Sequence, residues 1–399
     1  MKMNSLLTAG CSAIVLAFTA SAAQADTTTT VDFATGVRAA SNPYLLAGTS
    51  TGSGAAFIEA RPNIEVKTDQ STFLIDAAAR FDEYFRRYNS DFSGRADISY
   101  DRSLSEFTHL KLAVGAASSM GGSRDILQAG VGAGTGTVVN PNTDVSAAGL
   151  RFRQYEYATD AHLTSNLSAL DIVEVGGGVR IFDANSATAQ SFRQYGADAT
   201  YRRQVSELLS IGPKVSYSKV DYRNLAAGDG HILTTVMALK YKLSETASLS
   251  ANAGASFASI RQAAGASAKV NGFVGELAFC NTLETSTTCL NAGRSIRATS
   301  LGGVSTETSI SGDQSWRISE RDTIRISLGY YRTDQPAASA LLFGSNRSRL
   351  FSASSSYSRQ LSERLFIDVS AQYEKNWGQT IARDANVVGM ATIRYRLGQ

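Results

Sequence analysis

The turn sequence Tyr357-Ser-Arg-Gln-Leu-Ser-Glu363 and four close copies of it decide the fold. The copies read Tyr100-Asp-Arg-Ser-Leu-Ser-Glu106, Tyr201-Arg-Arg-Gln-Val-Ser-Glu207, Tyr241-Lys-Leu-Ser-Glu245 and Trp316-Arg-Ile-Ser-Glu320. Apolar residues alternate with polar ones after each copy, which is typical of a β-strand leaving a tight turn. The aromatic residue lies three or five positions before the turn serine, and this odd spacing predicts that all five rings share one face. Aromatic residues at one depth above polar turns indicate the interfacial girdle of a transmembrane β-barrel.

Charged residues line the other face of the expected strands. From residue 56 to residue 67 the even positions are apolar, and most odd positions are charged or polar. A water-filled lumen lined by both signs of charge accounts for this pattern, because a charge near the middle of the lipid-facing wall costs about 2–4 kcal/mol. Opposite charges also recur along single strands, as in Asp76 with Arg80, Glu174 with Arg180 and Asp198 with Arg202.

These two patterns give two sets of candidate residues. The candidate lumen-lining residues are Glu59, Arg61, Glu65, Asp76, Arg80, Arg151, Glu174, Arg180, Asp198, Arg202, Arg325, Arg394 and Arg396. The candidate girdle residues are Tyr100, Tyr201, Tyr241, Trp316, Tyr357 and Tyr395.

The turns also predict the size of the barrel. Seven short connections, near Asp69, Ser105, Ser168, Ser206, Ser244, Ser319 and Ser362, have periplasmic character. Seven such turns joining eight hairpins predict an all-β, antiparallel, up-and-down transmembrane barrel of 16 strands, formed by one domain over residues 26–399. Long extracellular loops are expected near 118–147 and 262–298. A hairpin hidden in the second of these would raise the count to 18.

Residues 1–25 have the pattern of a cleaved signal peptide, with a lysine near the start, an apolar centre and Ala23-Gln24-Ala25 before the expected cleavage point. Export to an oxidising compartment predicts a disulfide between Cys280 and Cys289, placed in an extracellular loop. The residues around the cysteines suggest no metal site, and no cofactor is expected.

The charge balance says little about partners. Lys and Arg total 38, and Asp and Glu total 35, which gives a net charge of +3. No basic patch is interleaved with aromatic residues, so nucleic-acid binding is not expected. Asp229 and His231 are the one candidate catalytic pair, for an outer-membrane hydrolase, but the chain is predicted not to be an enzyme.

The sequence Phe-Arg-Gln-Tyr occurs at 152–155 and again at 192–195. We interpret these segments as an upper aromatic girdle with arginines at the rim. A cluster of cations inside the lumen is the alternative.

Three segments resemble the β-barrel porin type 2 family of Gram-negative bacteria. They are Ala40-Ser-Asn-Pro-Tyr44, Gly121-Gly-Ser-Arg-Asp125 and Leu361-Ser-Glu-Arg-Leu365. The resemblance covers essentially the whole mature chain and implies an outer-membrane barrel; members are frequent in alphaproteobacteria, and some lie beside exopolysaccharide genes. Most such barrels end on an aromatic residue that the barrel assembly machinery recognises, whereas this chain ends in Gly398-Gln399, which leaves Tyr395 as the candidate signal.

The sequence therefore predicts a porin-like channel for small polar solutes, or a conduit for an exported polysaccharide, in the cell outer membrane. The alternatives are a structural or surface-interaction barrel without transport and, less favoured, the hydrolase. The expected partners are outer-membrane lipid and lipopolysaccharide, the assembly machinery and, for a conduit, polysaccharide export components.

Overall fold

The computed structural model describes residues 26–46, 52–120, 151–185, 189–223, 227–262, 267–300, 303–334, 347–377 and 383–398. The first strands are β1 (Asp26–Ala40), β2 (Ser53–Lys67), β3 (Ser71–Tyr84), β4 (Asp91–Ser105), β5 (Thr108–Met120), β6 (Arg153–Asn166), β7 (Asp171–Ala184), β8 (Phe192–Gln204) and β9 (Leu209–Tyr222). The second half contains β10 (Ala227–Lys242), β11 (Ala247–Gln262), β12 (Ser267–Thr282), β13 (Ser286–Ala298), β14 (Val304–Arg317), β15 (Asp322–Asp334), β16 (Arg347–Gln360), β17 (Leu365–Trp377) and β18 (Asn386–Gly398).

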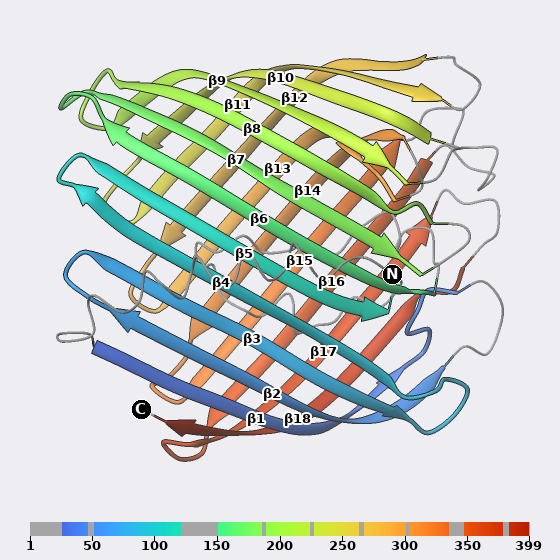
Figure 1. The fold of residues 1–399 in the computed structure, drawn as a ribbon. Helices are drawn as coiled ribbons and strands as arrows, with labels where there is room; N and C mark the ends of the chain where they lie inside the picture. Colours follow the sequence, from blue (N-terminus) through green and yellow to red (C-terminus); the bar gives the residue numbers. More distant parts are fainter. Residues whose placement is uncertain are drawn as a thin grey trace, which may run out of the picture.

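These strands form one closed barrel (Figure 1). Each strand pairs antiparallel with its neighbours in the chain, and β1 closes the ring by pairing with both β2 and β18. The predicted all-β, up-and-down barrel is confirmed. Among the described residues, no helix is long and apolar enough to span a membrane.

The strand count corrects the expectation of 16. The described residues form 18 strands, which is the alternative count. All seven expected short turns are present, and an eighth joins β12 to β13 at residues 283–285. The segment 262–298, expected to be an extracellular loop, is therefore mostly wall. The segments 1–25 and 121–150, which hold the expected signal peptide and most of the other long loop, lie outside the described residues.

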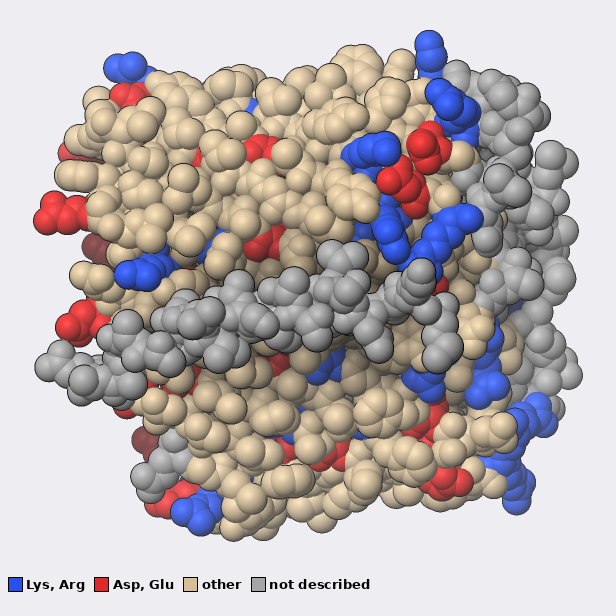
Figure 2. Space-filling model, viewed as in Figure 1, with Lys and Arg blue, Asp and Glu red and all other residues tan. Residues whose placement is uncertain are grey.

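The two faces of the wall differ in chemistry. Ile58 on β2 and Phe273 on β12 point outward and are 62% and 63% exposed. Figure 2 shows one side of the barrel, where charged side chains gather toward the two ends and the band between them is mostly uncharged. Because so broad an apolar surface is unfavourable in water, the outer face requires an apolar surrounding.

A repeated serine arrangement builds several of the short turns. The Ser168 Oγ accepts hydrogen bonds from the backbone N–H groups of Leu170 and Asp171, both at 3.1 Å, and donates to the Asp171 carboxylate at 2.7 Å. The hydroxyls of Ser206 and Ser244 accept corresponding bonds. These hydroxyls satisfy backbone donors that the strand ladder leaves unpaired, which explains the recurrence of serine in the turn motif.

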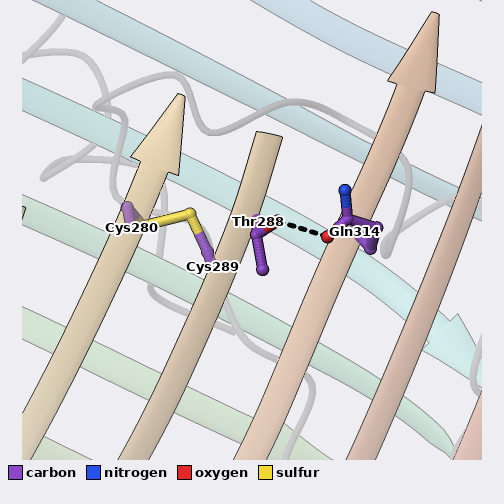
Figure 3. The surroundings of a disulfide bond; sticks show 4 residues. All are labelled: Cys280, Thr288, Cys289 and Gln314. Atoms are coloured by element: carbon purple, nitrogen blue, oxygen red, sulfur yellow. Dashed lines mark hydrogen bonds between the residues drawn. A yellow bond between two sulfur atoms is a disulfide. The ribbon is translucent and has the colours of Figure 1, made fainter. Parts of the chain in front are cut away.

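The disulfide joins two strands rather than closing a loop. Cys280 on β12 and Cys289 on β13 are direct cross-strand partners with a Cα–Cα distance of 4.2 Å (Figure 3). Thr288, beside Cys289, donates to the amide oxygen of Gln314 on β14. The cysteines lie near the turn at 283–285, at the end of the barrel that carries the short turns. Their expected place in an extracellular loop is thus wrong.

Candidate functional site in the barrel lumen

Twelve of the 13 candidate lumen-lining residues lie on strand positions that face the lumen, as the register with the outward-facing apolar residues shows. The exception is Arg151, which precedes β6 and lies over the rings of Tyr44 and Tyr88, at 4.7 and 5.2 Å from their centroids. The six candidate girdle residues all lie on the outward face. Among them, Tyr201 and Tyr357 each donate a 2.6 Å hydrogen bond, to Asp171 and Asp322 respectively.

The lumenal charges pair mainly across strands. Examples are Glu174 on β7 with Arg202 on β8, at 3.1 Å, and Asp76 on β3 with Arg95 on β4. The opposite charges noted along single strands, such as Glu174 with Arg180, do not form the observed pairs. Both pairs join diagonal neighbours on adjacent strands, about 7–8 Å apart, which long side chains can bridge, whereas residues four or six apart on one strand are farther from each other.

A cluster of charged residues lies where β1 and β18 close the barrel. Arg394 on β18 contacts Asp32 on β1 at 3.2 Å and Asp368 on β17 at 3.1 Å. Arg396 contacts Asp32 at 2.8 Å, and the Phe366 ring lies 4.3 Å from the Arg394 guanidinium. Three strands are therefore tied together where the two ends of the chain meet.

The outer end of the β13–β14 hairpin separates from β12 and lies inside the barrel, while β14 stays paired with β15 up to Thr306 and Asp334. Pairing between β12 and β13 stops at Gly275 and Arg294, whereas β13 and β14 stay paired up to Ala298 and Val304. Beyond Arg294, Ile296 and Ala298 pack with Val304 against lumenal apolar residues of β9–β12, namely Val220, Ile232, Ala258, Ile260 and Val274. The face of β13 that points outward near the short turns therefore packs, at the long-loop end, against the lumenal face of β9–β12.

Hydrogen bonds hold the tip of this hairpin. The Tyr222 hydroxyl on β9 donates toward the carbonyl oxygens of Thr299, at 3.1 Å, and Gly303, and accepts from the Thr299 N–H at 3.2 Å. The Gln190 N–H donates to the Ser300 carbonyl. In Figure 1 the hairpin end lies behind β7 and β8 in this view.

A second segment folds inward after β1. The Asn42 N–H donates to Asn386 at 3.1 Å, and the fully buried Tyr44 donates to the Tyr84 hydroxyl at 2.9 Å. Burial raises the pKa of Tyr44, so its hydroxyl remains protonated as this bond requires. Together with the hairpin, this segment narrows the long-loop end of the lumen.

A cavity of about 440 Å³ lies between the hairpin and the wall formed by β6–β10. Its lining includes Glu156, Asp160, Arg180, Gln194, Asp198 and Ile296. Of these, only Arg180 and Asp198 are among the candidate lumen residues, and the inward hairpin was not predicted from the sequence. Two signals were present: apolar residues occupy both faces of β10–β12 near the long-loop end, and Arg294 interrupts the outward apolar row of β13.

The repeated Phe-Arg-Gln-Tyr segments lie at the outer rim. Arg193 and Tyr195 on β8 are exposed on the outward face, beside Asp183 and Lys219 of the neighbouring strands. Arg153 and Tyr155 on β6 share this outward orientation, which agrees with rim arginines rather than a lumenal cluster. Phe152 and Phe192, by contrast, are buried in the inner apolar cluster and do not belong to an outer girdle. His231, proposed as part of a catalytic pair, also faces outward, on β10.

Comparisons with known proteins do not assign this chain to a family. No protein-family model matches the chain, and no curated protein is similar to it in sequence. Solved structures with some likeness include Pseudomonas aeruginosa OccK2 (OpdF) in complex with glucuronate, with a TM-score of 0.48, 11% identity, and 94% of this chain and 98% of that chain covered. A BenF-like porin from Pseudomonas fluorescens Pf-5 has a TM-score of 0.47 and 10% identity, over 94% of this chain and 99% of that chain.

The copper transporter OprC has a TM-score of 0.47 and 9% identity, and 89% of this chain spans 64% of that chain. This chain therefore spans less than two thirds of the length of the transporters that it matches. At these scores and identities the likenesses carry no argument about fold or function, and both rest on the geometry of the chain itself.

Proposed function

We propose that this chain is an outer-membrane channel through which small polar solutes diffuse. The observation that carries the proposal is the pairing of an apolar outer face with a charged inner face on one closed barrel. An apolar exterior suits lipid, and an interior lined by ion pairs suits water. A ring of 18 strands is wide enough to enclose an aqueous lumen.

The inward hairpin favours small solutes over a polymer. The hairpin and the segment after β1 occupy part of the long-loop end, so a flexible polysaccharide would meet a narrowed passage. Export of a polysaccharide remains a finer proposal, which would also require export components as partners. On either proposal the outer face contacts lipid and lipopolysaccharide, and the assembly machinery engages the end of β18.

Osmotic swelling of liposomes tests this function. The refolded protein, with heat-modifiable gel migration as the sign of a folded barrel, should admit small neutral sugars at rates that fall with increasing sugar size. Folded, inserted barrel that admits none of the sugars would contradict the channel and favour a structural or surface-interaction role.

A further inference from the structure

The cavity beneath the β13–β14 hairpin has the dimensions of a binding site. Its volume of about 440 Å³ lies within the range of about 300–1,000 Å³ that small-molecule sites occupy. The wall strands supply its back, and Ile296 on the hairpin supplies part of its front. From its lining, we propose that this cavity binds a small hydroxylated organic cation, of which an amino sugar is the simplest example.

The charge of the lining favours a cation. Glu156 is 5% exposed and pairs with Arg180, which is the only cationic side chain among the described lining residues. Within the described part of the chain, neither Asp160 nor Asp198 forms a hydrogen bond or a salt bridge. His162 and Arg180 lie near enough to attract the Asp160 carboxylate. Among its described residues, the lining still holds the three carboxylates of Glu156, Asp160 and Asp198 against the one guanidinium of Arg180, and so presents an excess of negative charge to whatever enters.

The nearby hairpin does not cancel this charge. Arg297 follows Ile296 on β13 and lies near enough to attract Glu156, but its guanidinium pairs with Glu307 on β14, so the two hairpin charges balance each other. An ammonium group within a few ångströms of Asp160 and Asp198 would be attracted by both carboxylates, even in a watery setting. A carboxylate in the same place would be repelled by a similar amount.

The remaining lining suits a hydroxylated ring. Gln194, Ser216, Ser218 and Thr234 offer an amide and three hydroxyls, which can both donate and accept hydrogen bonds. Ile232 and Ile296 give the cavity one apolar side, against which the C–H face of a sugar ring can pack.

Glycine residues in the wall enlarge the cavity, because they place no side chain in it. An added Cβ at Gly196 would meet no atom closer than 3.9 Å, so a side chain there is tolerated by the wall and would project into the space. Gly178 on β7, which also faces the lumen, likewise places no side chain in the cavity. Gly196 is therefore a position where the cavity can be filled without straining the strand.

This inference rests on the proposed function only for delivery of the ligand, because binding can be measured without transport. The experiment is calorimetric titration of the folded, full-length protein in detergent with glucosamine, glucose and glucuronate, which share one ring and differ in charge. We expect glucosamine to bind most tightly and glucuronate most weakly. Equal binding of the three sugars, or tightest binding of glucuronate, would overturn the proposal.

Two variants locate the site, and one controls for general effects. Asp160→Asn with Asp198→Asn removes both carboxylate charges at nearly constant volume and should weaken glucosamine binding at least tenfold. Gly196→Leu should abolish binding of glucosamine by occupying the cavity. Asp313→Asn removes a lumenal charge from β14, where Asp313 accepts a 2.6 Å bond from Ser327, and should leave the affinity within twofold.

The outcomes separate this inference from the channel itself. If the Asp160→Asn/Asp198→Asn variant and Gly196→Leu bind glucosamine as the wild type does, the cavity is not the site, whatever the liposomes show. If liposome swelling fails but the titration behaves as expected, the site stands and the channel does not.

Discussion

At the residue scale, an outward ring of the turn motif bonds to the neighbouring short turn rather than to the turn of its own motif. The Tyr357 hydroxyl donates to Asp322, and Asp322 accepts a second bond, at 2.7 Å, from the turn residue Ser319. Tyr201, Asp171 and Ser168 repeat this arrangement. The aromatic residues therefore position the turns as well as facing the interface.

Replacing Tyr357 with Asp tests this arrangement. The change removes a hydrogen bond worth about 1 kcal/mol, places a carboxylate beside Asp322 and adds up to about 1 kcal/mol for a charge at the interface. We expect a clear fall in the urea midpoint of unfolding in lipid vesicles. The matched control is Ser356→Asp on the lumenal face, which should change the midpoint little, and equal losses from the two variants would refute the assignment of faces.

The sequence could predict the face of most charged residues but not their partners. Alternation alone places Glu174 and Arg202 in the lumen. Their contact depends on the β7–β8 register, which pairs Ile172 with Arg202 and Glu174 with Thr200. No local pattern encodes this register, because it follows from the turn between the strands and from the barrel as a whole.

At the scale of single elements, the eighth turn shows how a motif can be missed. The turn at 283–285 has the same backbone bond as its relatives, from the Leu283 N–H to the Ser286 carbonyl at 2.7 Å. However, Leu283 stands where most of the other turns have serine, so the repeated motif is absent. Without that turn, β12 and β13 resembled a polar loop rich in threonine and asparagine.

The disulfide spans the seam with the least pairing. Among the described strands, the β12–β13 ladder is the shortest, running only from Gly275 and Arg294 to Thr282 and Thr287. Replacing Cys280 and Cys289 with serine should lower barrel stability by about 2–3 kcal/mol, because the cross-link no longer restricts the unfolded chain. The gel-migration transition should then occur at a lower temperature than in the wild type.

The control for this prediction is reduction of the wild-type protein, which should lower the transition temperature of the wild type to that of the variant. An unchanged transition in the variant would show that the seam holds without its cross-link.

The inward hairpin depends on Tyr222. Tyr222→Phe keeps the ring, whose centroid lies 5.6 Å from that of Phe192, but removes the bonds that the hydroxyl makes to Thr299 and Gly303, and leaves intact the backbone bond from the Thr299 N–H to the Gly303 carbonyl. We expect the hairpin tip to become sensitive to protease near residues 299–303, since leaving the Thr299 carbonyl unpaired costs about 1–3 kcal/mol. Tyr217→Phe on the outward face serves as the control, and identical protease patterns for the two variants would argue against this role.

At the scale of the whole molecule, side chains alternate between the lumen and the outer surface along each strand of the closed barrel, and this alternation separates the charged inside from the apolar outside. The hairpin is the exception, because there the outer row of β13 continues onto a surface that packs inside the barrel. This departure could not be predicted from a strand-by-strand analysis, since it joins residues of β9 and β13 that are far apart in the sequence. It also creates the cavity, so the candidate binding site follows from the architecture rather than from a motif.

The most direct test of the account is single-channel recording of two adjacent cysteine variants in planar bilayers. Ser354 faces the lumen and Ser355, paired with Ile326, faces outward, so Ser354→Cys and Ser355→Cys differ only in the face that carries the thiol. The account predicts discrete channel openings for both variants, and a stepwise fall in current after a trimethylammonium thiol reagent only for Ser354→Cys. Absence of openings, or an equal fall in both variants, would contradict a water-filled lumen bounded by these faces.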